Sequence, residues 1–438
     1  MRTKIIRSVL LVAFVLISLP AFAMEVKFMS DGDSFSRAVL PNGIKLLYNH
    51  DNSTSLTGIR ILIGGGLLTE NEENNGITNM MTKLLLKGDE RMNADQIAAR
   101  LEFLGAQVSA DCFRDYSAIS IVALSENFAD LMGIILRSLK TPQFPEEELK
   151  KLKIEVEGLI KAEIDNQTQA SSNLFWKTAY GGSGYGLSIL GTLTVINALT
   201  VADIQAHYRK LIGGDNIIVA VSTDLPPDQI SAILAPLNQI PAKSSAFNPP
   251  KSNPPSSQEG FLPFDRNQSF IFMGYPLPYP SQREFAIIGI LNEIMGANVG
   301  SRLWYLRQKE QLAYSVYTQA IYSKFGAVFR AAIGTDTSKV QTALASLKRE
   351  LALLHKEGIT ESELADARVN LKNRLIYQID RKGVRANYMA LYEYLGYGYR
   401  LPAELLREAE NITLAEVNEY ISAHLAPDGA YLSIVGKK

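Results

Sequence analysis

Cysteine is almost absent from this chain of 438 residues, since Cys112 is its only one. No disulfide can therefore form within the chain, and its stability must come from packing. Cys112 lies in the segment "SADCFRDYSAISIVAL", which alternates between polar and apolar residues as a strand does. We expect its thiol to be buried and unreactive.

Histidine is scarce as well, and the chain has four, of which no two lie three or four residues apart. A zinc site needs three protein ligands in a defined geometry. We therefore expect no metal site built on these histidines. The glycine clusters at 64–66 and 181–186 lack the lysine and hydroxyl of a phosphate-binding loop, and no serine stands in a nucleophile elbow.

Neither charge sign is in excess, because 44 lysines and arginines face 45 aspartates and glutamates. Without a basic excess, the chain offers nothing to attract nucleic acid, and we exclude that class of partner. Hydrophobic residues make up 47% of the sequence, which is an ordinary value for globular domains.

Long apolar runs are missing after the first residues. Residues 1–23 combine a basic start, an apolar run too short for a membrane span and the small residues "AFA". This pattern predicts a secretory signal peptide, with a mature chain from about Met24 and no membrane span after cleavage. We expect export, to the periplasm if the source is a Gram-negative bacterium. An uncleaved N-terminal anchor is the alternative.

The mature chain divides into two halves that repeat. Residues 241–259, rich in proline, serine and asparagine, predict a linker between an N-terminal domain at 24–240 and a C-terminal domain at 260–438. Residues 144–165 align without a gap with 359–380, and residues 199–212 align with 412–425. We infer two homologous units.

The repeated segments have the features of helices, and short apolar runs between them have those of strands. A threonine precedes an acidic residue by three positions at Thr200, Thr360 and Thr413, which predicts a capping box. Eight β-branched or aromatic runs predict strands. We expect an α+β fold in which each unit is a mainly antiparallel sheet with helices packed on one side. A doubly wound fold is less favoured, because regular strand–helix alternation is absent.

The order of several blocks resembles the M16 family of zinc peptidases, the pitrilysin and mitochondrial-processing-peptidase group. These blocks include "LPNGIKLL", "GITNMMTKLLLKGDE", "GLSILGTLTVINALTVADIQAHY", "GSRLWYLRQKEQLAYSVYTQA" and "EGITESELADARVNL". The resemblance covers nearly the whole mature chain and implies two M16/LuxS-like metallohydrolase-type domains.

In active members of the family the first helix carries His-x-x-Glu-His, which binds zinc and activates water. Here the pair Gly76-Ile77 aligns this motif with Asn79, Thr82 and Lys83, so its three residues are missing. The family's third ligand, a glutamate on a later helix, aligns near Leu159, with Glu157 close by. The resemblance therefore implies a degenerate motif and no metal in this chain.

The second half keeps a different feature of the family. Members whose C-terminal half assists catalysis carry an arginine and a tyrosine seven residues apart, and these align with Arg307 and Tyr314. A guanidinium and a phenol can both donate to a substrate carbonyl and to the oxyanion that develops there. The alternative is that Arg307 is a solvated helix residue and Tyr314 an ordinary strand residue.

Together these features resemble the non-metal subunit of bacterial two-chain M16 peptidases. The resemblance implies a zinc-bearing His-x-x-Glu-His partner, with zinc on that partner, and unfolded peptides as substrates. We expect this chain to be inactive alone and active only within such a heteromer. The alternative is a non-catalytic peptide-binding or structural homologue. Independent hydrolysis at a new site is a remote third possibility.

Overall fold

The computed structural model describes residues 27–32, 34–243, 246–252 and 259–437. The predicted signal peptide at 1–23 lies outside the described residues, as does part of the predicted linker. Within the described part of the chain, no helix has both the length and the apolar character that crossing a membrane requires.

The first half builds a seven-stranded sheet in the order β1-β2-β3-β7-β4-β6-β5. Its neighbouring strands are antiparallel except for β3 and β7, which are parallel. The strands are β1 (Met29–Ser30), β2 (Phe35–Val39), β3 (Lys45–His50), β4 (Leu56–Gly64), β5 (Gln107–Cys112), β6 (Tyr116–Leu124) and β7 (Ile217–Thr223). The helices are α1 (Ile77–Leu84), α2 (Ala94–Phe103), α3 (Phe128–Lys140), α4 (Glu146–Asp165), α5 (Gln167–Tyr180), α6 (Leu193–Ala198), α7 (Val201–Leu211) and α8 (Pro227–Leu234).

The second half builds a five-stranded sheet in the order β10-β11-β9-β12-β8, with one parallel pair, β12 and β8. Its strands are β8 (Glu259–Pro263), β9 (Gln268–Leu277), β10 (Ser315–Ser323), β11 (Gly326–Asp336) and β12 (Tyr431–Gly436). The helices are α9 (Gln282–Met295), α10 (Trp304–Gln308), α11 (Val340–Glu357), α12 (Glu361–Asp380), α13 (Lys382–Leu395), α14 (Leu401–Asn411) and α15 (Leu414–His424).

The predicted fold class is confirmed, since both units are α+β with mainly antiparallel sheets. The two sheets also share one topology, because β3-β7-β4-β6-β5 corresponds strand by strand to β8-β12-β9-β11-β10. All eight predicted strands are present, and the three predicted capping boxes at Thr200, Thr360 and Thr413 are formed. The sequence did not predict β1, β2 or β8.

Side chains alternate between the two faces of each sheet. In β4, Ile61 and Ile63 pack with the helices of the first half, whereas Leu62 faces the core of the second half. In β9, Ile271 lies in the core beneath the second half's own helices, and Phe272 packs against α5. Both faces of each sheet are therefore covered, as the period of two in a strand requires.

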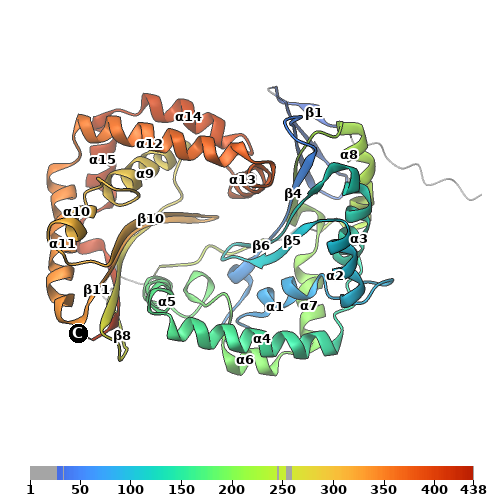
Figure 1. Ribbon diagram of the computed structural model, residues 1–438, viewed down its shortest axis with the longest axis horizontal. Coiled ribbons are helices and arrows are strands. Elements are labelled where there is room, and N and C mark those ends of the chain that lie inside the picture. Colours follow the sequence, from blue (N-terminus) through green and yellow to red (C-terminus); the bar gives the residue numbers. More distant parts are fainter. Residues whose placement is uncertain (1–26, 33, 244–245, 253–258, 438) are drawn as a thin grey trace, which may run out of the picture.

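The second face of each sheet is covered by a helix from the opposite half (Figure 1). Helix α13, from the second half, lies across β4 and β7 of the first sheet, while α5, from the first half, lies across β9 and β12 of the second. These two helices begin at residues 167 and 382, at the same spacing as the repeated segments before them. The halves thus exchange equivalent helices, which the sequence did not predict.

The exchange depends on one close backbone contact and several polar ones. A Cβ atom on Gly58 of β4 would lie 2.4 Å from the backbone nitrogen of Gly383, so the two chains approach too closely for a side chain. Nearby, the Lys45 ammonium pairs with Glu393 of α13 at 2.6 Å.

At the other exchanged helix, one arginine of the second sheet meets α5. Arg330 donates to Ser172 Oγ at 2.9 Å and stacks 4.1 Å from the centre of the Phe272 ring. Burial lowers the pKa of Arg330 to about 10, which leaves the guanidinium charged at neutral pH. The Phe272 ring and the Ser172 hydroxyl therefore both stabilise the buried cation of Arg330.

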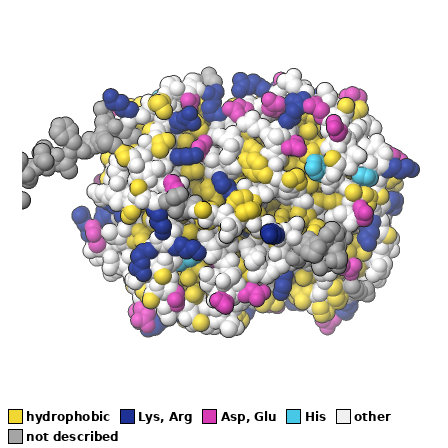
Figure 2. All heavy atoms as spheres, turned by 180° about the vertical axis from the view of Figure 1, so that it is seen from behind, with side chains coloured by type: hydrophobic (Ala, Val, Ile, Leu, Met, Phe, Trp, Pro, Cys, Tyr) yellow, Lys and Arg dark blue, Asp and Glu magenta, His cyan; other side chains and the backbone are white. Residues whose placement is uncertain are grey.

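Charges are well mixed on the molecular surface. Figure 2 shows lysine and arginine side chains interspersed with acidic ones, and apolar side chains in patches between them. No large area of one sign covers the face seen there.

We predict that Gly58→Ala destabilises the fold by about 1–3 kcal/mol, because its methyl group would collide with the backbone of α13. Gly158→Ala in α4 is the matched control, since a Cβ atom there would meet nothing within 4 Å and alanine favours helices by about 1 kcal/mol. Denaturant unfolding measures both. Equal stability of the two variants would contradict the close approach of β4 and α13.

We predict that limited proteolysis cuts first between residues 241 and 259, as expected of a linker with few backbone hydrogen bonds. Because α5 and α13 pack on opposite halves, the two fragments should still elute together on size exclusion without denaturant. Early cuts within 144–165 would argue against this boundary. Separation of the fragments would argue against a tight exchange.

Candidate functional site

The degenerate motif lies on α1, whose first turn is held in a fixed position. Gly76 precedes the helix with a left-handed φ of 96°, and a Cβ there would lie 2.9 Å from Gly191. Only glycine meets both demands without strain. The Glu70 carboxylate accepts hydrogen bonds from the backbone N–H groups of Gly76 and Thr78, at 2.7 and 2.9 Å. It thereby caps the helix start.

Two buried titratable groups support this first turn. Burial raises the pKa of Glu70, although the hydrogen bonds that it accepts act in the opposite direction. His207 of α7 lies with Nε2 2.8 Å from Thr78 Oγ1, and burial lowers the pKa of His207 to about 4, so the ring is neutral at pH 7. Sequence reasoning did not single out either contact. His207 therefore supports the first turn of α1.

The motif positions on α1 carry no ligand chemistry. Asn79 is only 3% exposed, and its side-chain nitrogen has no hydrogen-bond partner among the described residues. Thr82 donates to the carbonyl oxygen of Thr78 at 2.7 Å, inside its own helix. Lys83 extends toward α4, where its ammonium lies 4.0 Å from Glu155.

Helix α4 lies beside α1, as the predicted position of a third ligand requires. Leu159 follows Glu155 by one turn on the same helical face and is 40% exposed. The nearby Glu157 pairs with Lys161 in its own helix at 2.7 Å. The structure therefore brings the four degenerate positions onto two adjacent helices.

Zinc does not fit these residues. An amide, a hydroxyl, an ammonium and an alkyl side chain offer neither the imidazoles nor the carboxylate of the family's zinc site, and Lys83 adds a positive charge. Across the residues that the structure describes, no three histidine, cysteine, aspartate or glutamate side chains gather as a metal site.

Arg307 and Tyr314 stand at the two ends of a short closed segment in the second half. The N–H of Leu312 donates to the carbonyl of Leu306 at 3.0 Å, which brings the ends of the segment together. Gln311 between them has a positive φ of 53°, the value that lets the chain turn back. The N–H of Tyr314 then donates to Gly334 at 2.8 Å, where β10 begins beside β11.

Both functional groups face solvent. The Tyr314 side chain is 56% exposed, and Arg307 is exposed, with its guanidinium 4.8 Å from the centre of the Trp304 ring. Neither the phenol nor the guanidinium has a hydrogen-bond or ion-pair partner among the described residues. The fold therefore leaves both groups free to donate to another molecule.

The degenerate motif and the Arg/Tyr pair do not form one site in this chain. Figure 1 shows α10 in the second half and α1 in the first, with α5 between them in this view. No pocket described in the structure is lined by residues of both groups.

Comparison with known families assigns both halves. Residues 45–193 match the family model described as insulinase, peptidase family M16, and residues 198–371 match the one described as peptidase M16 inactive domain. Together the two matches span most of the described chain.

Bacterial relatives match over nearly their full length. A Bacillus subtilis protein named an uncharacterized zinc protease, YmxG, is 24% identical over 90% of this chain and 98% of its own. A Helicobacter pylori protein named a non-peptidase homolog, YmxG, is 23% identical over 90% of this chain and 92% of its own. These names thus include both a protease and a protein without peptidase activity.

Solved structures share the fold. The peptidase M16 inactive domain from Pseudomonas fluorescens superposes with a TM-score of 0.84 at 19% identity, covering 92% of this chain and 98% of that one. A protease from Helicobacter pylori gives a TM-score of 0.82 at 16% identity, covering 92% and 99%. With both halves matched, this chain belongs to the peptidase M16 family.

Proposed function

We propose that this chain is an exported, zinc-free M16 subunit that supplies Arg307 and Tyr314 to a zinc-bearing His-x-x-Glu-His partner for the hydrolysis of unfolded peptides. The predicted signal peptide at 1–23 supports export. The observation that carries the proposal is that both side chains are exposed and that neither has a hydrogen-bond or ion-pair partner among the described residues.

The chemistry of the pair suits this role. In peptide hydrolysis the carbonyl oxygen of the cleaved bond gains negative charge as water adds to the carbon. A phenol and a guanidinium fixed near that oxygen stabilise the charge, because both groups donate hydrogen bonds and the guanidinium is cationic. The zinc and its activated water would come from the partner.

The fold fixes the backbone around Arg307 and Tyr314, while their functional groups make no hydrogen bond or ion pair with described residues of the chain. Leu306 and Leu312 are buried on either side of Arg307 and anchor the segment, while β-pairing fixes the backbone of Tyr314. Exposure alone does not mark a functional tyrosine, since Tyr305 is 52% exposed beside Tyr314 at 56%, so the proposal depends on the fixed positions of Tyr314 and Arg307 together.

The second candidate is a non-catalytic peptide-binding or structural homologue. The name of the Helicobacter pylori relative, a non-peptidase homolog, favours this alternative, as does the loss of the zinc ligands. The two candidates differ in their need for an oxyanion donor, which Tyr314 and Arg307 test directly.

We predict that Tyr314→Phe lowers peptide turnover by the mixed subunits about 100- to 1,000-fold, the usual effect of losing one oxyanion donor. Arg307→Lys should also slow the reaction, because it keeps the charge but loses the planar fork. Tyr305→Phe changes an exposed tyrosine on α10, the helix that carries Arg307. It is the matched control and should act as wild type. Unchanged turnover in both variants, with association of the chains intact, would favour the non-catalytic alternative.

We predict that the purified chain holds no stoichiometric zinc, because its motif positions offer no metal ligands. Restoring histidine at 79 and 83 with glutamate at 82 should not create a tight site, since Leu159 still lacks the third ligand. Elemental analysis of both proteins checks this. About one tightly bound zinc per wild-type chain would refute our account of α1 and α4.

A further inference from the structure

Two pockets lie at equivalent places in the repeated halves. One, of about 500 Å³, lies where α12 meets α13, and the other, of about 580 Å³, lies where α4 meets α5. Their helix residues correspond at the spacing of the repeat: Ile379 with Ile164, Arg385 with Ala170, Tyr388 with Asn173, and Met389 with Leu174. We call them the ion-pair pocket and the apolar pocket.

Equivalent strands complete the two pockets. Residues 49–51, at the end of β3, line the ion-pair pocket, and residues 262–264, at the end of β8, line the apolar pocket. Both strands are the ones that pair in parallel with a neighbour in their sheet. Each pocket is therefore shared between a helix junction of one half and a strand of the other.

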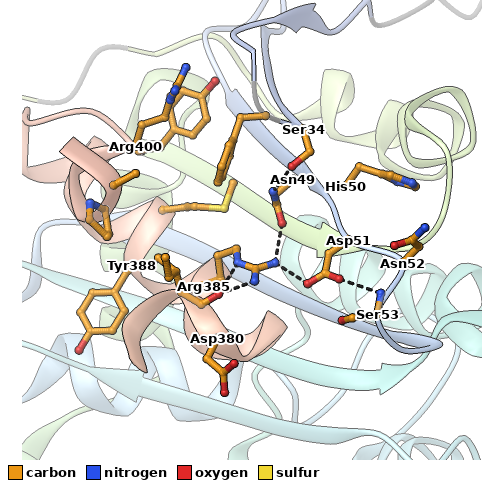
Figure 3. Close-up of a pocket in the computed structure, with 16 residues that line it drawn as sticks. Ser34, Asn49, His50, Asp51, Asn52, Ser53, Asp380, Arg385, Tyr388 and Arg400 are labelled. Atoms are coloured by element: carbon orange, nitrogen blue, oxygen red, sulfur yellow. Dashed lines mark hydrogen bonds and ion pairs between the residues drawn. The ribbon is translucent and has the colours of Figure 1, made fainter. Parts of the chain in front are cut away.

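The chain's own Arg385 satisfies the ion-pair pocket (Figure 3). Its guanidinium donates to Asp51 at 2.6 Å and to Asn49 at 2.8 Å. Burial raises the pKa of Asp51, but hydrogen bonds from Ser53 and Arg385 outweigh this effect and hold the pKa well below its usual range. The charge of Asp51 in this pocket is thus already matched by Arg385.

The apolar pocket lacks this internal partner. Ala170 stands where the ion-pair pocket has Arg385, and Phe264 stands at the position that corresponds to Asp51. Leu174 and Leu187 add apolar surface, and glycines of the loop after α5 bring backbone close to the cavity. A cavity of this size with mostly apolar walls is within the range that binds small molecules.

Two charged side chains line the apolar pocket without partners. Glu72, from the loop before α1, and Lys177, from α5, are exposed, and neither forms an ion pair or a side-chain hydrogen bond among the described residues. The third charged residue, Glu163, differs, because it accepts a hydrogen bond from Ser188 at 3.3 Å and interacts electrostatically with Arg114.

We propose that the apolar pocket binds short apolar peptides with free termini. The Glu72 carboxylate would receive the α-ammonium group, the Lys177 ammonium would receive the terminal carboxylate, and the cavity would take the side chains. Binding of this kind requires no partner chain and no metal. Such peptides are products of peptide hydrolysis, so a peptidase reaction would supply them.

Calorimetric titration of this chain alone with the tripeptide Leu-Phe-Leu tests the proposal. We expect saturable binding that weakens about tenfold when the peptide is N-acetylated and about tenfold when it is C-amidated, since each change removes one charge-assisted hydrogen bond. No binding, or equal binding of the free and doubly blocked peptides, would overturn the proposal.

Variants place the peptide in this pocket. Glu72→Gln should remove the preference over the N-acetylated peptide, and Lys177→Met the preference over the C-amidated one. Both residues are exposed, so folding should survive. Glu73→Gln, at the neighbouring exposed glutamate that does not line the pocket, should bind as wild type.

Ala170→Arg copies the side chain that occupies the ion-pair pocket and should abolish binding. Wild-type affinity in Ala170→Arg, Glu72→Gln and Lys177→Met alike would overturn the assignment of this pocket. Because binding is measured without a partner chain, the result is independent of any effect of Tyr314 or Arg307 on turnover.

Discussion

The exchange of α5 and α13 between the halves is the constraint on which the rest of the structure depends. Each sheet buries much of its second face against a helix that belongs to the opposite half. The contact of Gly58 with Gly383 sets how closely α13 approaches, and Arg330 fixes α5 on the other sheet. The two halves are therefore joined through both sheets.

The first helix keeps its place without its metal because its support does not involve the ligands. Glu70 caps the start of α1, His207 contacts Thr78 from α7, and Gly76 allows the tight approach to Gly191. All three interactions use backbone or residues outside the motif. The three interactions therefore do not depend on Asn79, Thr82 or Lys83, and Asn79 keeps one buried amide nitrogen without a partner among the described residues.

Local sequence patterns predicted many of the strands and helices of this fold. They predicted less of how the two halves pack together. The eight strands, the long helices α4 and α12, and the capping boxes follow from periodicity and turn chemistry, and the family resemblance located α1 and the Arg/Tyr pair. The exchange was not predicted, because periodicity does not say which helix covers a face. A signal was present in β11, whose residues apart from Arg330 are mostly apolar or small on both faces, as in a doubly covered sheet. The sequence could not predict how the two pockets differ at Ala170 and Arg385. Each residue lines its pocket together with residues of the opposite half, and sequence alone does not bring those residues together.

The central claim is that this chain completes a peptidase whose zinc lies on another chain. The most direct measurement is peptide hydrolysis by a zinc-bearing His-x-x-Glu-His M16 chain from the same organism, with and without this chain. The account predicts that cleavage is weak with either chain alone and rises to saturation as this chain is added. Equal cleavage by the zinc-bearing chain in the absence and presence of this chain would contradict it.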